Sequence, residues 1–154
     1  MILIAQIRLT EHFLGELKPD QEGVRRFRRD REGRVLLNQS YWLEQLCVAS
    51  RSLRLPALDI PQTVIPPTAM LPASIHLKRR VFSGRYTELF ESFRKGTILT
   101  FEMQLHTEKE HCPTSGQLQI LLQYVGSHLG ISPFGSKFGL GRFDCLSLKT
   151  VLSL

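Results

Sequence analysis

Apolar and polar residues alternate with a period of two in several parts of the chain. Residues 3–9 place Gln6 and Arg8 between apolar side chains, and residues 98–106 alternate throughout. This period is typical of strands with one buried face, because successive side chains of a strand point to opposite sides. Residues 75–82 form a further strand candidate, and residues 142–151 fit a closing strand.

Three other segments carry apolar residues three or four positions apart, the spacing of one helix face. They are residues 40–55, beginning at the N-cap candidate Ser40; residues 86–95, ending before Gly96; and residues 114–129, beginning with a capping box of Thr114 and Gln117. Pro56 ends the first of these predicted helices, because proline cannot continue a helix.

This order of elements predicts one domain, residues 1–154, of the α+β class, with helices on one face of an antiparallel sheet. Residues 55–72 contain five prolines, which exclude regular helix and favour an extended surface connection. An arm that docks on a neighbouring subunit is the alternative interpretation of this stretch.

The net charge of +6 and the pI near 9.6 favour a polyanionic partner. Three cysteines, Cys47, Cys112 and Cys145, are far apart and lack metal-ligand spacing, so we expect free thiols in a reducing compartment. No stretch approaches the ~20 apolar residues of a membrane span. We therefore expect a cytoplasmic protein without a membrane segment, metal or cofactor.

The positive charge is concentrated in residues 24–37, which we call the basic segment. Six of the ten residues from 25 to 34 are arginine, and the acids among them are Asp30 and Glu32. A turn at 30–33 predicts a hairpin, whose arginines around Phe27 would offer phosphate contacts and a stacking surface. The alternative is a solvated hairpin that its own acids and nearby acids partly neutralise.

A glycine-rich loop, residues 130–143, joins the last helix to the closing strand. Glycines permit positive φ and close backbone approach, so N–H groups beside Lys137 suit a phosphate. The loop lacks the Gly-Lys-Ser/Thr of a Walker motif, and a tight connection with phenylalanines filling the core is equally compatible. Together with a second basic cluster at 78–80, the expected nucleic-acid contacts are Arg25, Arg26, Arg28, Arg29, Arg31, Lys78, Arg79, Arg80, Gly135, Ser136, Lys137, Gly139, Gly141 and Arg142.

The first strand, the passage 29–37 leading into a helix, and the sequence Gly135–Phe143 resemble the RAMP superfamily, the RNA-binding subunits of CRISPR effector complexes. The chain also resembles small phage-encoded proteins that end in a glycine-aromatic strand of this kind. The resemblance implies a ferredoxin-like, RRM-like core with a C-terminal glycine-rich loop. It also implies a single-stranded RNA or DNA partner, with self-association or other ribonucleoprotein subunits as further partners.

Three functions are compatible with these patterns. The sequence favours a module that binds the backbone of single-stranded nucleic acid, and the resemblance implies that this nucleic acid is RNA. A metal-independent endoribonuclease would need a histidine general base, and His12, just after the first strand, is the first candidate among five histidines. A protein-interaction module of phage origin is the third possibility.

Overall fold

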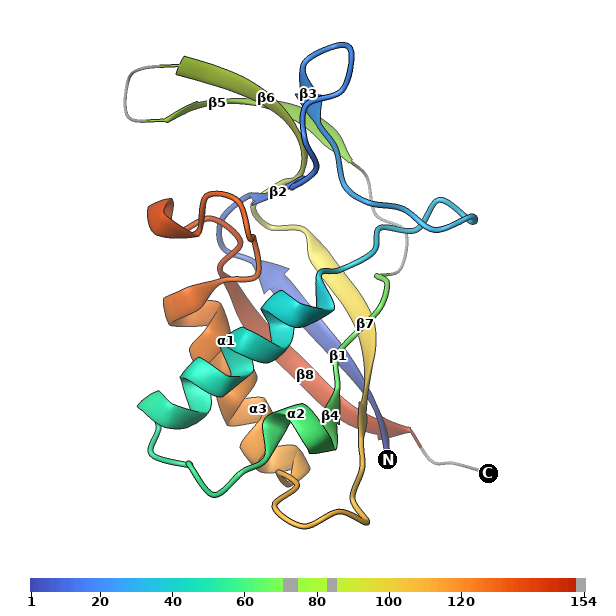
Figure 1. Cartoon of the computed structure of the whole chain (residues 1–154), viewed down its shortest axis with the longest axis vertical. Coiled ribbons are helices and arrows are strands. Elements are labelled where there is room, and N and C mark those ends of the chain that lie inside the picture. The colour runs from blue at the N-terminus through green and yellow to red at the C-terminus, as the bar shows by residue number, and fades with distance from the viewer. Residues whose placement is uncertain (71–74, 83–85, 152–154) are drawn as a thin grey trace.

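The computed structural model describes residues 1–70, 75–82 and 86–151. Its main sheet has the strand order β4 (Val64–Ile65), β7 (Ile98–Leu105), β1 (Ile2–Leu9) and β8 (Phe143–Val151), and every neighbouring pair is antiparallel. Figure 1 shows this sheet in the lower part of the molecule. The strands expected at residues 3–9, 98–106 and 142–151 are confirmed.

Helices cover one face of the main sheet (Figure 1). They are α1 (Gln39–Ser52), α2 (Ile60–Thr63) and α3 (Ser115–Tyr124), and α3 continues through a π-helical turn at Val125–Leu129. The odd-numbered side chains of β1 are buried in the core beneath them, which explains the alternation of that strand. Trp42 of α1 meets the ring of Phe101 of β7 edge-on, with centroids 5.0 Å apart. The described residues thus form an α+β protein.

The two long helices begin and end for local reasons. Asn38, and not the expected Ser40, caps α1, because its side-chain oxygen accepts from the backbone N–H of Tyr41 at 3.0 Å. The helix ends at Ser52, ahead of Pro56, where Arg54 takes a φ of 58°. The capping box of Thr114 and Gln117 at the start of α3 is confirmed.

A second, mixed sheet is built around β6 (Tyr86–Phe93). Strand β5 (His76–Phe82) and β2 (Phe13–Leu14) pair with it antiparallel, and β3 (Val24–Arg25) pairs with it parallel. Strands β5 and β6 form an extended arm, which lies above the main sheet in Figure 1. The strand expected at residues 75–82 is confirmed, although the side chains of Arg79 and Arg80 lie outside the described set.

The helix predicted at residues 86–95 is wrong, because most of this segment is strand β6. Its apolar side chains serve two separate cores on opposite faces of the strand. Phe90 packs with Leu14 in a small cluster, whereas the ring of Phe93 lies 4.9 Å from that of Phe27 in the main core. Residues three apart share a helix face but occupy opposite faces of a strand, so tertiary packing overrode the helical spacing.

The proline-rich stretch is also more structured than expected. Pro61 occupies the first turn of α2, where its missing N–H does not interrupt a helical hydrogen bond. Strand β4 follows this helix directly and pairs with β7. Pro66 and Pro67 are buried, and Met70 bridges to Phe101. The extended surface connection is therefore wrong for residues 60–70, while Pro72 lies outside the described residues.

The turn at the end of α3 packs directly against the closing strand. A Cβ atom on Gly126 would overlap the carbonyl oxygen and ring of Phe143. By contrast, a Cβ on Gly116, in the first turn of α3, would meet only the Thr114 hydroxyl at 3.9 Å. The two glycines therefore offer a matched pair of substitutions in one helical segment.

We expect Gly126→Ala to lower the free energy of unfolding by about 2–3 kcal/mol, because the added methyl group forces α3 away from β8. Gly116→Ala should instead raise it by roughly 0.5–1 kcal/mol through helix propensity. Urea denaturation followed by circular dichroism measures both. Equal effects of the two substitutions would contradict the close approach at Gly126.

Candidate nucleic-acid interface

The basic segment folds as the expected hairpin at its far end. Backbone hydrogen bonds join Leu36 N–H to Arg28 C=O at 2.8 Å and Asp30 N–H to Arg34 C=O at 3.0 Å. The side chain of Asp30 accepts from the backbone N–H groups of Glu32 and Arg34, each at 2.9 Å. Asp30 therefore stabilises the turn.

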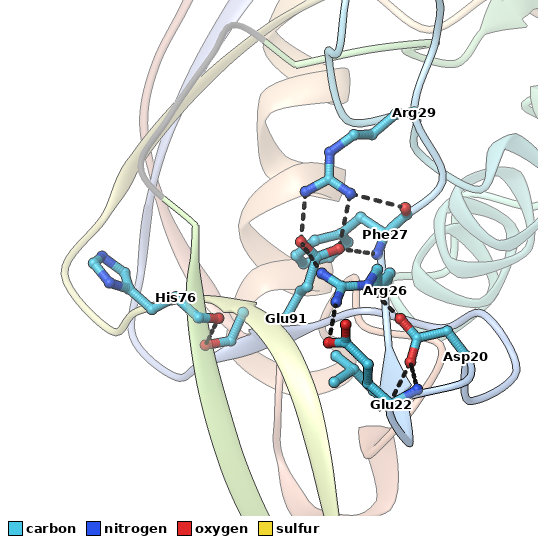
Figure 2. A network of polar contacts seen from close by, with 9 residues as sticks. Asp20, Glu22, Arg26, Phe27, Arg29, His76 and Glu91 are labelled. Atoms are coloured by element: carbon cyan, nitrogen blue, oxygen red, sulfur yellow. Dashed lines mark hydrogen bonds and ion pairs between the residues drawn. The ribbon is translucent and has the colours of Figure 1, made fainter.

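A buried carboxylate on β6, that of Glu91, holds the root of the basic segment (Figure 2). Its two oxygens accept from the two terminal nitrogens of Arg29 at 2.8 and 2.6 Å. One of the same oxygens accepts from the backbone N–H of Phe27 at 2.9 Å, and Arg26 approaches the other at 3.7 Å. The Glu91 side chain is only 6% exposed, so these contacts replace its lost hydration.

The ionisation of Glu91 reflects this environment. Burial alone raises the pKa of its carboxyl, but the hydrogen bonds from Arg29 and Phe27 and the charges of Arg29 and Arg26 outweigh burial. The net pKa lies below its ordinary value of 4.5. Glu91 is therefore ionised in the folded protein at neutral pH and balances the nearby arginines.

Most other arginines of the basic segment are also paired with acids. The pairs are Arg25 with Glu88 at 2.8 Å, Arg26 with Asp20 at 2.6 Å and with Glu22 at 3.4 Å, and Arg34 with Asp30 at 2.8 Å and with Glu32 at 3.3 Å. Within the described part of the chain, Arg28 and Arg31 are the two arginines of the segment that form no ion pair. The solvated-hairpin interpretation thus accounts for four of the six arginines.

Phe27 does not offer the stacking surface that the sequence suggested. Its side chain is buried, and its ring packs against Phe13 and Phe93 with centroids 5.2 and 4.9 Å apart. The cause is the alternation of the extended chain, which turns Phe27 inward while its arginine neighbours point to the surface.

The glycine-rich loop makes a sharp, closely packed turn. Gly130, Gly135, Gly139 and Gly141 all have positive φ, between 75° and 85°. Three of their N–H groups donate hydrogen bonds inside the protein. Gly130 donates to the carbonyl of Val125, Gly139 to that of Ser136, and Gly141 to that of His12. These N–H groups are not available to an anion, so the expected phosphate cradle is wrong at those positions. Lys137 is exposed, whereas Arg142 is half-buried and donates to the His128 carbonyl at 3.3 Å.

The structure brings the start of the basic segment, the arm and the glycine-rich loop together. The guanidinium of Arg25 lies 4.5 Å from the centre of the Phe134 ring, and that ring lies 5.1 Å from Phe90 of β6. Lys78 of β5 is directly opposite Phe90 in register, so it shares the face of the arm that meets the loop. Lys78 and the exposed Lys137 therefore belong to the two segments that meet at this junction, the arm and the loop.

The far end of the basic segment lies elsewhere. Figure 1 shows its tip, in light blue, on the opposite side of the molecule from the glycine-rich loop, in red and orange. Arg28 lines a hollow of about 290 Å³ together with Asn38 and Thr68, and it also lines a small pocket with Ile131 and Pro133 of the glycine-rich loop. The predicted contact residues are thus divided: Arg25 and Arg28 adjoin the glycine-rich loop, whereas the tip of the basic segment lies away from it.

His12 lies beside the glycine-rich loop, but its ring is already engaged. Its Nδ1 atom accepts from the backbone N–H of Lys95 at 3.3 Å, which places the ring proton on Nε2. The other histidines are His76 in β5, His106 beside Glu108, His111 in a turn and His128 stacked on Tyr124. The described residues contain no group of three or more side chains arranged to hold a metal ion.

The three cysteines are free thiols, as expected. Burial raises the pKa of each thiol above its ordinary value of 9.0. None of the helices in the described ranges has the length and apolar character needed to span a bilayer.

We expect Glu91→Gln to lower the free energy of unfolding by about 2–3 kcal/mol, because it removes a charge-assisted pair of hydrogen bonds from a buried site. Glu32→Gln is the matched control: it breaks an ion pair whose carboxylate is 72% exposed and should cost less than about 0.5 kcal/mol. Urea denaturation measures both. A small effect at Glu91 would show that this contact does not stabilise the hairpin.

Acid should weaken the same contact. Because the folded pKa of Glu91 lies below 4.5, ionised Glu91 contributes stability above that pH, and the contribution is lost as pH falls through the folded pKa. The stability difference between wild type and Glu91→Gln should therefore shrink below pH 4.5. The pKa values of Asp20 and Asp30 are also lowered. Both residues occur in wild type and in the variant, so their contributions to stability cancel in the difference. A difference independent of pH would contradict this assignment.

Comparison of the sequence with protein-family models and with curated proteins finds no match. Among solved structures, the fold is similar to that of a chain in a structure entitled "Type IV-B CRISPR Complex", with a TM-score of 0.63. The similarity covers 100% of this chain and 92% of that chain, at 12% sequence identity. At this identity the likeness is one of fold, and at that level it confirms the resemblance to subunits of CRISPR effector complexes.

Proposed function

We propose that the chain is a RAMP-type, RNA-binding subunit of a CRISPR-like ribonucleoprotein. The observation that carries this proposal is the fold similarity over the full chain to a chain of a type IV-B CRISPR complex. The element order supports a ferredoxin-like core: α1 lies between β1 and β4, α3 between β7 and β8, and the sheet order is β4-β7-β1-β8. The same arrangement supports the proposal of a single domain.

The proposed path of the RNA runs along the junction of the arm with the glycine-rich loop. Lys78 and Lys137 belong to the two segments that meet there, and neither takes part in an ion pair among the described residues. The sequence of strand β5 also contains Arg79 and Arg80, whose side chains lie outside the described set. Cations without acid partners are the ones that can neutralise phosphates and release counterions.

The paired arginines have a different role in this proposal. Arg25 and Arg29 form ion pairs with Glu88 and Glu91 of β6, so they keep the arm in place. Arg26 pairs with Asp20 in the loop that precedes β3. Arg28 and Arg31, which form no ion pair among the described residues, remain as additional phosphate contacts. Contact with phosphates in place of bases predicts weak sequence preference.

We expect Lys78→Gln with Lys137→Gln to weaken binding of a single-stranded RNA of about 30 nucleotides by at least tenfold near 100 mM salt. The magnitude of the slope of log K against log salt should fall by about 1.4, because each lost contact to a single strand removes about 0.7. Fluorescence anisotropy across a salt series, with RNA and with DNA of the same sequence, measures both quantities.

Arg51→Gln with Lys109→Gln is the control, since it removes the same charge from α1 and from the loop between β7 and α3. It should leave the slope within about 0.3 of wild type. Equal losses in both double variants would mean that net charge alone attracts the RNA. Absence of wild-type binding near 150 mM salt, where specific contacts persist, would overturn the proposal. Recovery of intact RNA separates binding from cleavage.

A further inference from the structure

The face of the main sheet opposite the helices carries exposed apolar side chains. Ile4 of β1, Ile98 of β7 and Val151 of β8 are all at least 37% exposed. Ile4 and Ile98 belong to this face because the alternate side chains of their strands are buried toward the helices. Val151 belongs to it because it pairs with Ile2, which is on the same side of β1 as Ile4. Figure 1 shows the helices on one side of this sheet only. This open face therefore leaves apolar surface in water.

The charges on the open face are balanced and ordered by the strand register. Ile4 is paired with Glu102 on β7 and with Lys149 on β8, so one row reads acid, isoleucine, base. Two rows along, Arg8 is paired with Asp144 on β8. These four charged side chains are exposed and sum to zero. A neutral face of this kind does not attract a polyanion, so it does not extend the RNA path.

We infer that the open face binds a second copy of this chain, with a two-fold axis parallel to β1. Such an axis exchanges the two flanks of β1, so Glu102 of each copy faces Lys149 of the other. Ile4 then packs on Ile4 along the axis. In the dimer, the row of Arg8 contains the Arg8 and Asp144 side chains of both copies, so its net charge is zero.

A hollow beside Glu102 provides room for the facing lysine. It measures about 210 Å³ and is also lined by Ile4, Thr100 and Arg34. The Arg34 guanidinium is 2.8 Å from Asp30 and 3.3 Å from Glu32, so its charge is already compensated. Among the described residues, Glu102 and Lys149 take part in no ion pair. Each is thus available to the other copy.

The size of the face indicates a weak dimer. Three strands of eight or nine residues cover a patch about 26 Å long and roughly 15 Å wide, or about 400 Å². Standard interfaces bury about 800 Å² on each partner, so association is expected only at high micromolar protein concentrations. Two twisted sheets that pack face to face keep their strands nearly aligned. A two-fold axis parallel to β1 produces this alignment.

Sedimentation equilibrium of the RNA-free protein between about 10 μM and 1 mM tests the inference. Wild type should form a dimer, and Glu102→Lys or Lys149→Glu alone should weaken it at least about tenfold, because each places like charges opposite one another. The two single variants mixed together should form a heterodimer, and the double variant should dimerise like wild type. This reciprocal rescue is specific to the proposed two-fold axis.

Ile120→Lys is the control, because it charges an exposed apolar side chain of α3 and should leave dimerisation unchanged. Circular dichroism confirms that each variant is folded. A wild type that stays monomeric to about 1 mM, or single variants that dimerise like wild type, would overturn the inference. The outcome does not depend on RNA binding, so it leaves the proposed function to its own test.

Discussion

A carboxylate that leaves water must recover equivalent hydrogen bonds inside the protein, and Glu91 does so through Arg29 and the backbone N–H of Phe27. The contact joins residues more than 60 positions apart in the sequence. It fixes the root of the basic segment on β6 and turns the ring of Phe27 into the aromatic cluster that connects the two sheets. This interaction is therefore one of the contacts that hold the arm in its position relative to the main sheet, together with the pairing of β6 with β2 and β3.

The same contact changes how the net charge of +6 should be understood. A count of arginines places the greatest positive potential at the basic segment, but four of its six arginines are opposite acids. The cations without acid partners include Lys78 and Lys137, which belong to the arm and to the glycine-rich loop that meets it. The proposed RNA path is therefore determined by which charges remain unpaired, and charge density along the sequence does not predict it.

The glycine-rich loop and the open face illustrate two different uses of backbone geometry. In the loop, positive φ at Gly141 lets the chain pass close to Ser132, and the N–H of Gly141 is used by the carbonyl of His12. On the open face, strand register aligns Glu102, Ile4 and Lys149 in one row across three strands. The first arrangement closes the fold, and the second leaves a surface whose charges complement a rotated copy of itself.

The sequence by itself determined the features that depend on neighbours in the chain. The alternation of β1 and β7, the capping box at Thr114 and the turn at Asp30 are all set by side chains within a few residues, so they could be predicted. Strand β6 could not, because the spacing of Leu89, Phe90 and Phe93 also fits a helix, and only packing against two distant cores selects the strand. The pairing of the arginines with Glu88 and Glu91 was hidden for the same reason: ion pairs between distant residues exist only after the chain has folded.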